Sequence, residues 1–206
     1  MSTTPRSGDT AYASGASTAS GIADSGNGRW IDGFATRVLA VLRIAFGLTF
    51  LWAFLDKLLA LGFATGRSVD DKGVETLDRF GPDAWINGNS PTEGFLAFGA
   101  KGPFESFYHS IAGAWWADWL FMLGLLGIGV ALLSGVAMRI GTAAGALMYA
   151  LMYAAVLPLE NNPVVDDHLI GVIVMVVLAL AYAGRTWGLG RWWESRDFVR
   201  KNPVLR

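Results

Sequence analysis

Hydrophobic residues gather in four segments of the chain, and polar residues fill the stretches between them. The segments cover residues 34–61, 115–137, 140–157 and 169–183. The last segment has no charged residue between His168 and Arg185. A helix from His168 to Trp187 would be roughly 30 Å long, which matches the hydrocarbon core of a bilayer. The pattern therefore predicts an all-α fold: an integral membrane four-helix bundle.

The first segment carries charges inside its apolar run. Arg43, Gly47, Phe50, Phe54 and Lys57 recur at helical spacing and form one stripe. Because a charge that faces lipid is costly, this stripe should face the other helices. Small residues at four-residue spacing in the second and third segments predict close helix packing; they are Gly127, Ala131, Gly135, Gly141 and Gly145.

A long polar connection, residues 62–113, separates the first two segments. Loops of this length without elements of their own are uncommon, so short helices are expected in it. Residues 104–111 place Phe104, Phe107, Tyr108 and Ile111 on one helical face. This pattern predicts an interfacial helix that lies on the membrane.

The two ends of the chain differ from the middle in composition. Residues 1–29 are rich in Ser, Thr, Gly and Ala and lack the hydrophobic core of a signal peptide, so they are interpreted as a disordered cytoplasmic tail. Residues 30–193 form the predicted membrane domain. Residues 194–206 are interpreted as a basic cytoplasmic tail.

Charge predicts the orientation of the four segments. Basic residues flank one set of segment ends: Arg29, Arg37, Arg139, Arg185, Arg191, Arg196, Arg200, Lys201 and Arg206. The connection between the third and fourth segments has Glu160, Asp166 and Asp167 and no Lys or Arg. The positive-inside bias thus places both termini in the cytoplasm and the long loop outside. The expected location is the plasma membrane, with several passes.

Composition supports the same class and excludes others. The chain is 53% hydrophobic and 16% charged, whereas soluble domains carry about 25% charge. The bilayer is therefore the expected partner, and a net charge of −1 gives no reason to propose nucleic acid. The absence of cysteine excludes disulfides, thiolate metal sites and cysteine nucleophiles. Two histidines are too few for most metal or haem sites.

Helix order brings a group of chemically active side chains to the outer face: Asp56, Lys57, Trp115, Trp116, Asp118, Trp119, Tyr153, Asp166, Asp167 and His168. His168 could handle protons or bind a substrate, or it could be a solvated interfacial residue. Asp166 and Asp167 precede a helix and could simply cap it. The tryptophans could be interface anchors, Tyr149 and Tyr153 packing residues, and Lys57 a snorkelling side chain.

Arg43 has two interpretations as well. It lies inside the apolar run, where a long side chain could snorkel to the cytoplasmic interface. Alternatively, its guanidinium could contact an anion or a quinone carbonyl inside the bundle.

Several short motifs occur in an order that resembles a known family. They are residues 90–96 (SPTEGFL), 102–104 (GPF), Asn162-Pro163 followed by Asp167-His168, and residues 183–192 (AGRTWGLGRW), together with the Arg43 and Lys57 pattern. From Trp30 to Trp193 the chain resembles DoxX-family membrane proteins, especially the DoxD-like subunits of thiosulfate:quinone oxidoreductase. The resemblance implies a four-helix bundle and electron transfer from thiosulfate to membrane quinone.

The expected function is therefore that of a quinone-linked redox subunit. Lys57, Asp167 and His168 are the candidate catalytic residues, and Arg43, Tyr149, Tyr153 and Trp116 are the candidate quinone contacts. A second redox subunit or a further copy of the chain is the expected protein partner. The alternative is a non-enzymatic scaffold that anchors a partner oxidoreductase. A small-solute transporter is a weaker third reading, because the chain shows no internal repeat.

Overall fold

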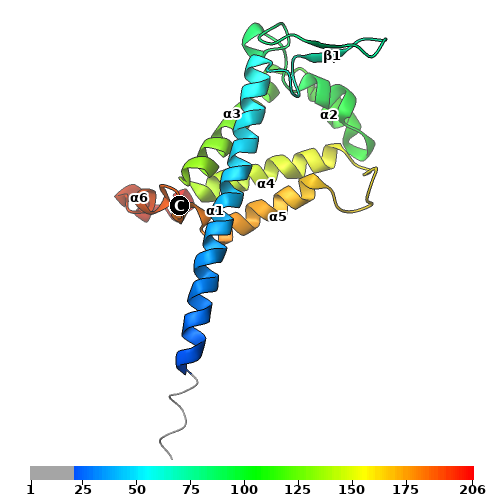
Figure 1. Cartoon of the computed structure of the whole chain (residues 1–206). Coiled ribbons are helices and arrows are strands. Elements are labelled where there is room, and N and C mark those ends of the chain that lie inside the picture. Colours follow the sequence, from blue (N-terminus) through cyan, green and yellow to red (C-terminus); the bar gives the residue numbers. More distant parts are fainter. Residues whose placement is uncertain (1–20) are drawn as a thin grey trace, which may run out of the picture.

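The computed structural model describes residues 21–206, and the described part is mostly helical (Figure 1). Four long helices dominate it: α1 (Gly21–Leu59), α3 (Trp115–Ser134), α4 (Met138–Ala155) and α5 (Asp167–Leu180). Each matches one predicted hydrophobic segment. The first twenty residues of the predicted N-terminal tail lie outside the described residues, while residues 21–29 belong to α1.

The long connection contains several short elements. A hairpin pairs β1 (Arg67–Val69) with β2 (Glu75–Leu77), with Arg67 opposite Leu77. The 3-10 turns η1 (Trp85–Asn87) and η3 (Gly102–Phe104) flank a π-helical turn, η2 (Phe95–Gly99). The helix α2 (Glu105–Ile111) then follows, one residue shorter than predicted. Short helices were expected here, whereas the hairpin was not.

The four long helices form two pairs. In one pair α1 packs against α3, and in the other α4 packs against α5. In Figure 1 the α4–α5 hairpin runs across the direction of α1, and α4 contacts α3 near the turn that joins them. The structure therefore shows a helical fold built from two crossing pairs.

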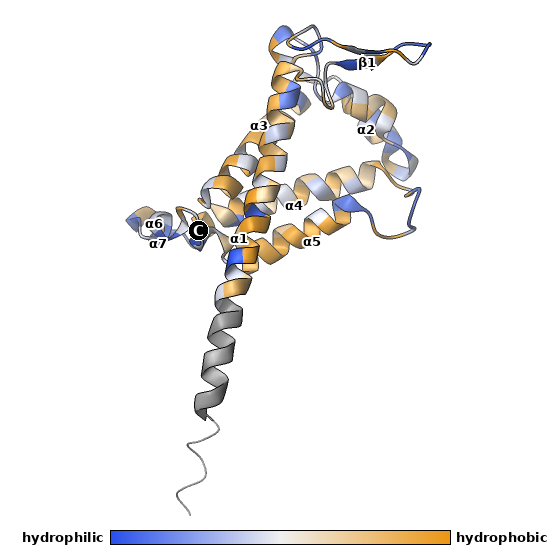
Figure 2. Cartoon of the chain, viewed as in Figure 1, coloured by the Kyte–Doolittle hydropathy of each residue, from blue (hydrophilic) through white to orange (hydrophobic). Residues whose placement is uncertain are grey.

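Two of these helices are long and apolar enough to cross a membrane. They are Gly33–Leu59 of α1 and the whole of α3. The apolar helix α5 has 14 residues, so its length of about 21 Å is less than the roughly 30 Å of a hydrocarbon core. Figure 2 shows hydrophobic residues along all four long helices and hydrophilic ones on the β-hairpin and near the C-terminus.

The end of the fourth segment differs from the prediction. The apolar run extends to Ala183, but α5 ends at Leu180 because Tyr182 adopts a left-handed conformation with φ 48°. A 3-10 turn, η4 (Ala183–Arg185), follows. The change of helix direction at Tyr182 brings Gly184 against Gly135, where an added Cβ would lie 2.6 Å from the Gly135 carbonyl oxygen.

The predicted C-terminal tail is folded onto the protein. It contains the end of α6 (Gly190–Glu194), all of α7 (Asp197–Lys201) and the turn η5 (Pro203–Leu205). The Arg139 backbone N–H donates to the Arg206 carbonyl at 2.8 Å, and its side chain donates to the Pro203 carbonyl at 2.9 Å. These contacts fix residues 203–206 beside the start of α4.

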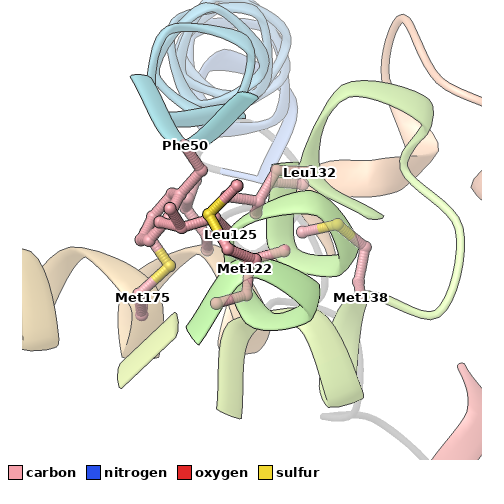
Figure 3. Close-up of a cluster of buried hydrophobic side chains, with 9 residues drawn as sticks. Phe50, Met122, Leu125, Leu132, Met138 and Met175 are labelled. Carbon is pink, nitrogen blue, oxygen red and sulfur yellow. The ribbon is translucent and has the colours of Figure 1, made fainter. Parts of the chain in front are cut away.

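The hydrophobic core lies where the two helix pairs meet (Figure 3). Phe50 of α1, Met122 and Leu132 of α3, Met138 of α4 and Met175 of α5 are buried together. Methionine side chains are flexible and polarisable, so they fill the irregular space between crossing helices.

Glycines allow α1 and α3 to approach closely. A Cβ on Gly129 of α3 would lie 2.9 Å from the backbone nitrogen of Leu51 on α1. A Cβ on Gly47 of α1 would lie 3.0 Å from the backbone nitrogen of Leu133 on α3. The predicted small-residue packing is partly wrong: Gly127 is exposed and has no atom within 4 Å of an added Cβ.

Two alanine substitutions on α3 test this packing. Gly129→Ala should destabilise the protein by about 1–3 kcal/mol, because the Leu51 backbone must move. Gly127→Ala, two residues earlier, should leave stability unchanged or raise it, since alanine is the better helix former. Thermal unfolding in mild detergent measures both variants. Equal melting temperatures would contradict the close approach of α1 and α3.

Candidate functional site

The Arg43 side chain is fully buried at the junction of three segments. Its Nη1 donates to the carbonyls of Leu132 and Leu133, the latter at 3.0 Å. Its Nη2 donates to the Trp187 carbonyl at 3.0 Å and to the Thr186 carbonyl at 3.4 Å. Leu132 and Leu133 belong to the last turn of α3, whose carbonyls lack partners within the helix. The guanidinium therefore caps the negative end of α3.

This geometry differs from the snorkelling interpretation of Arg43 made from the sequence. The side chain is 0% exposed, so it does not snorkel to solvent. Its Nη atoms are engaged by backbone carbonyls, and only Nε lacks a partner within the described residues. The expected contact with a quinone gains no support from these bonds.

Two buried carboxylates hold the long connection, residues 62–113, to the helices. Asp118, at the start of α3, accepts hydrogen bonds from Ser90 Oγ at 2.7 Å and Thr92 Oγ1 at 2.6 Å. Asp56, near the end of α1, accepts from the backbone N–H groups of Phe63 and Ala64. The 90–96 motif thus has a structural role at the first turn of α3.

An open pocket of about 450 Å³ lies between the end of α4, the start of α5 and the long connection near Gly99 and Lys101. Gly99, Lys101, Val156, Leu159, Glu160, Asn161, Asn162, Val165, Asp166, Asp167 and His168 line it. It is the best candidate site because it gathers titratable and amide side chains around one volume.

His168 and Asp166 form a close pair at this pocket. His168 Nδ1 lies 2.6 Å from Asp166 Oδ2, and both side chains are mostly buried. Asp166 also caps α5, since its Oδ1 accepts from the Leu169 backbone N–H at 2.9 Å. Burial raises the pKa of Asp166, but the hydrogen bonds from Leu169 and His168 outweigh it and hold the pKa below its usual value. The carboxylate thereby orients the imidazole through Nδ1, and Nε2 is the ring nitrogen that it does not contact.

An aromatic group connects His168 to the helix core. The Tyr149 ring lies edge-on to His168 at 6.4 Å and to Phe50 at 5.3 Å. Gly171 of α5 makes room for Tyr149, since a Cβ there would lie 2.7 Å from the ring. Tyr149 therefore packs beside the imidazole from the side of the core.

Lys101 is a pocket residue that the sequence interpretation missed. Its Nζ lies 2.9 Å from Glu160 Oε1, and hydrogen bonding to Lys101 lowers the pKa of Glu160. The Lys101 backbone N–H donates to the Ala155 carbonyl at 2.8 Å. Gly102, whose φ is 71°, lies against the Leu157 carbonyl. The Gly102-Pro103 pair was the sequence signal that could have identified Lys101, because this pair marks a turn that meets the end of α4.

The expected site residues separate into those inside and those outside the pocket. Asp167 and His168 line it. Lys57 lies at the end of α1 with its ammonium 6.0 Å from the Phe121 ring centroid, and Trp116 is 47% exposed on α3. Tyr153 Oη donates to the Val164 carbonyl at 2.8 Å and so holds the loop that ends in the pocket.

The four residues expected to hold a quinone make separate contacts in the structure. Arg43 caps α3, Tyr149 packs against Gly171, Tyr153 bonds the loop, and Trp116 faces outward. Among the described residues, no group of three or more His, Asp or Glu side chains is placed to hold a metal ion.

The pocket lining has an acidic balance. Glu160, Asp166 and Asp167 contribute carboxylates, and Lys101 contributes the one permanent positive charge of the lining. Like charges repel, so this lining favours a neutral or cationic ligand over a sulfur oxyanion.

Arg43 yields the first prediction for this region. Arg43→Gln should destabilise the protein by roughly 2–4 kcal/mol, because several buried carbonyls lose their donor. Arg43→Lys should restore part of this loss, since an ammonium cannot reproduce the planar fork of donors. Arg37→Gln, on the exposed face of α1, is the matched control. Melting temperature and membrane abundance provide the readout, and a stable Arg43→Gln protein would contradict the capping role.

The second prediction concerns pH. Since folding lowers the pKa of Asp166, its carboxylate contributes stability above the unfolded pKa of about 3.9, and this contribution is lost as pH falls through the folded value. Asp166→Asn keeps a helix-capping oxygen but should flatten the loss of melting temperature as pH falls below about 4. Asp167→Asn removes the same charge next to the cap and serves as control. An unchanged acid profile in Asp166→Asn would overturn this account.

The chain matches no protein-family model, no curated protein and no solved structure, and its similarity to the DoxX family stays a prediction from the motifs quoted above.

Proposed function

We propose that the protein is a multi-pass plasma-membrane protein of the DoxX type. It has four spans, and both termini lie in the cytoplasm. Two helices of sufficient length and hydrophobicity support this proposal. The distribution of Lys and Arg supports the orientation. The outer loop, α2 and the pocket then lie on the extracytoplasmic side.

The short helix α5 can span the membrane if the residues on either side of it add to its apolar length. The turn η4 continues the apolar run, and Arg185 at its end can reach the headgroup region. A bilayer adapts to a short hydrophobic stretch by local thinning, at a modest cost per ångström. The α4–α5 hairpin would then cross as one tilted pair beside α1 and α3.

Within this membrane protein, the proposed activity is that of a quinone-linked redox subunit. The redox link rests on the resemblance to DoxD-like subunits, and the observation that carries the site is the 2.6 Å contact between His168 and Asp166 at the pocket. A quinone supplies two-electron, two-proton chemistry. An imidazole oriented by a carboxylate can act as a general acid or base through Nε2. Asp166 holds the ring orientation, and Tyr149 limits its movement toward the core.

Thiosulfate is a less suitable ligand for this pocket than the resemblance implies. The carboxylates of the lining oppose an anion. At this pocket Lys101, and not Lys57 as first expected, supplies the positive charge. Lys101 is paired with Glu160. A sulfur oxyanion would therefore have to bind on a partner subunit.

A scaffold that anchors a partner oxidoreductase is the second candidate. The bonds of Arg43 and Tyr153 favour it, because both side chains stabilise backbone segments. The exposed β-hairpin and outer loop offer a surface for such a partner.

Quinone reduction distinguishes the two candidates when it is measured, with thiosulfate as the electron donor and without it, on the complex copurified with its partner subunit from native membranes and placed in nanodiscs. His168→Gln should lower the rate by about 10²-fold, the usual contribution of a positioned general acid or base. His109→Gln is the matched control, because His109 is an exposed histidine on α2, outside the pocket. A scaffold would leave the rate of quinone reduction by the complex unchanged in both histidine variants.

A further inference from the structure

The segment 187–206, here called the C-terminal platform, lies beside the junction of the two helix pairs. In Figure 1 the helix α6 projects sideways from the long helices, close to the C-terminus. The platform is firmly attached on one side. Val199 is fully buried, and the Leu189 backbone N–H donates to the Ser134 carbonyl at 2.7 Å. Trp193 Nε1 donates to the Leu205 carbonyl at 2.5 Å. It is therefore a folded unit at a defined place.

The other side of the platform exposes large apolar side chains. Trp187 is 61% exposed, and Trp192 and Phe198 are each 51% exposed. A soluble surface seldom presents such a group of aromatic residues together. Tryptophan is the residue that membrane–water interfaces favour.

Basic side chains accompany these aromatic residues. The exposed ones are Arg191, Arg196, Arg200 and Lys201. The Arg196 guanidinium lies 4.2 Å from the centroid of the Trp192 ring. Within the described residues, neither Arg191 nor Arg196 nor Lys201 forms an ion pair, and Arg200 lies 3.7 Å from the exposed Asp197 carboxylate. The platform thus keeps an excess of positive charge next to apolar rings.

We propose that the C-terminal platform binds anionic phospholipid headgroups of the cytoplasmic leaflet. The inference rests on the membrane placement given under the proposed function, and it is independent of the redox activity. The exposed rings enter the boundary between headgroups and acyl chains, and the guanidinium and ammonium groups contact lipid phosphates. Arginine suits this role because its planar fork pairs with two phosphate oxygens. The mixture of rings and basic groups fits a lipid surface, because an acidic soluble partner would not require so many exposed rings.

The position of Arg43 connects this surface to the helix junction. Arg43 donates to the carbonyl of Trp187, the first residue of the platform, to that of Thr186 just before it, and to those that end α3. Movement of the platform away from the helices would break the hydrogen bond from Arg43 to Trp187 and the one from Leu189 to Ser134 at the end of α3. Lipid binding at this surface should consequently stabilise the contact between the helix pairs.

A single introduced cysteine tests the proposal, because the chain contains none of its own. Ser195→Cys lies between α6 and α7, and Ser68→Cys lies on the β-hairpin; both positions are exposed. Each full-length variant is labelled with an environment-sensitive dye and reconstituted in nanodiscs of phosphatidylcholine alone or mixed with phosphatidylglycerol. The emission at residue 195 should shift to the blue when the anionic lipid is present, and that at residue 68 should not.

Replacement of basic side chains provides the second test of the headgroup site. The double variant Arg196→Gln and Arg200→Gln should weaken the preference for phosphatidylglycerol by roughly 25-fold, since each basic residue near an anionic surface contributes about fivefold. The matched control is Arg67→Gln with Lys72→Gln on the exposed hairpin, which should retain the full preference. High salt should reduce the wild-type preference, because it screens exposed charges.

Each outcome bears on the proposal. Equal emission in both lipid mixtures, or a full preference in the doubly neutralised variant, would overturn the headgroup site while leaving the membrane placement intact. Labelling of the same cysteines in intact cells with an impermeant reagent tests that placement separately: residue 68 should react and residue 195 should not. Reaction at residue 195 would refute both the orientation and the headgroup site.

Discussion

The buried guanidinium of Arg43 sets the geometry at the junction of the helices. It is always charged, so it must be surrounded by hydrogen-bond acceptors, and the free carbonyls at the end of α3 supply them. The carbonyls of Thr186 and Trp187 complete the set. As a result one side chain connects α1, α3 and the segment after α5. The close approach through Gly47 and Gly129 then follows, because the helix backbones must lie near enough for the guanidinium to reach.

Carboxylates organise the long connection and the start of α5 in a similar way. Asp118 and Asp56 satisfy hydroxyl and backbone donors of residues 62–113, and Asp166 caps α5 while it orients His168. The same chemistry therefore fixes the loop and shapes the pocket. Because Asp166 serves the helix cap and the histidine together, the stability of α5 and the protonation chemistry at the pocket are coupled.

The two ends of the protein differ in charge and composition, and this difference suits a protein between two aqueous compartments. The pocket gathers carboxylates, a lysine and a histidine, whereas the C-terminal platform gathers arginines with exposed aromatic rings. A pocket of acidic balance can attract cations or neutral ligands, and a basic aromatic surface attracts anionic lipid.

Apolar periodicity over many residues leaves few alternatives, so the four long helices and α2 could be predicted from the amino-acid pattern, apart from residues 21–29 of α1. The pattern also identified His168 and Asp167 as neighbours, since they are adjacent in the chain. Long-range packing determines which backbone carbonyls surround Arg43, that Lys101 meets Glu160, and that Lys57 and Trp116 lie outside the pocket. These contacts join residues far apart in the chain, and periodicity carries no information about which segments meet. The crossing of the two helix pairs and the folding of residues 194–206 onto α4 depend on the same long-range packing.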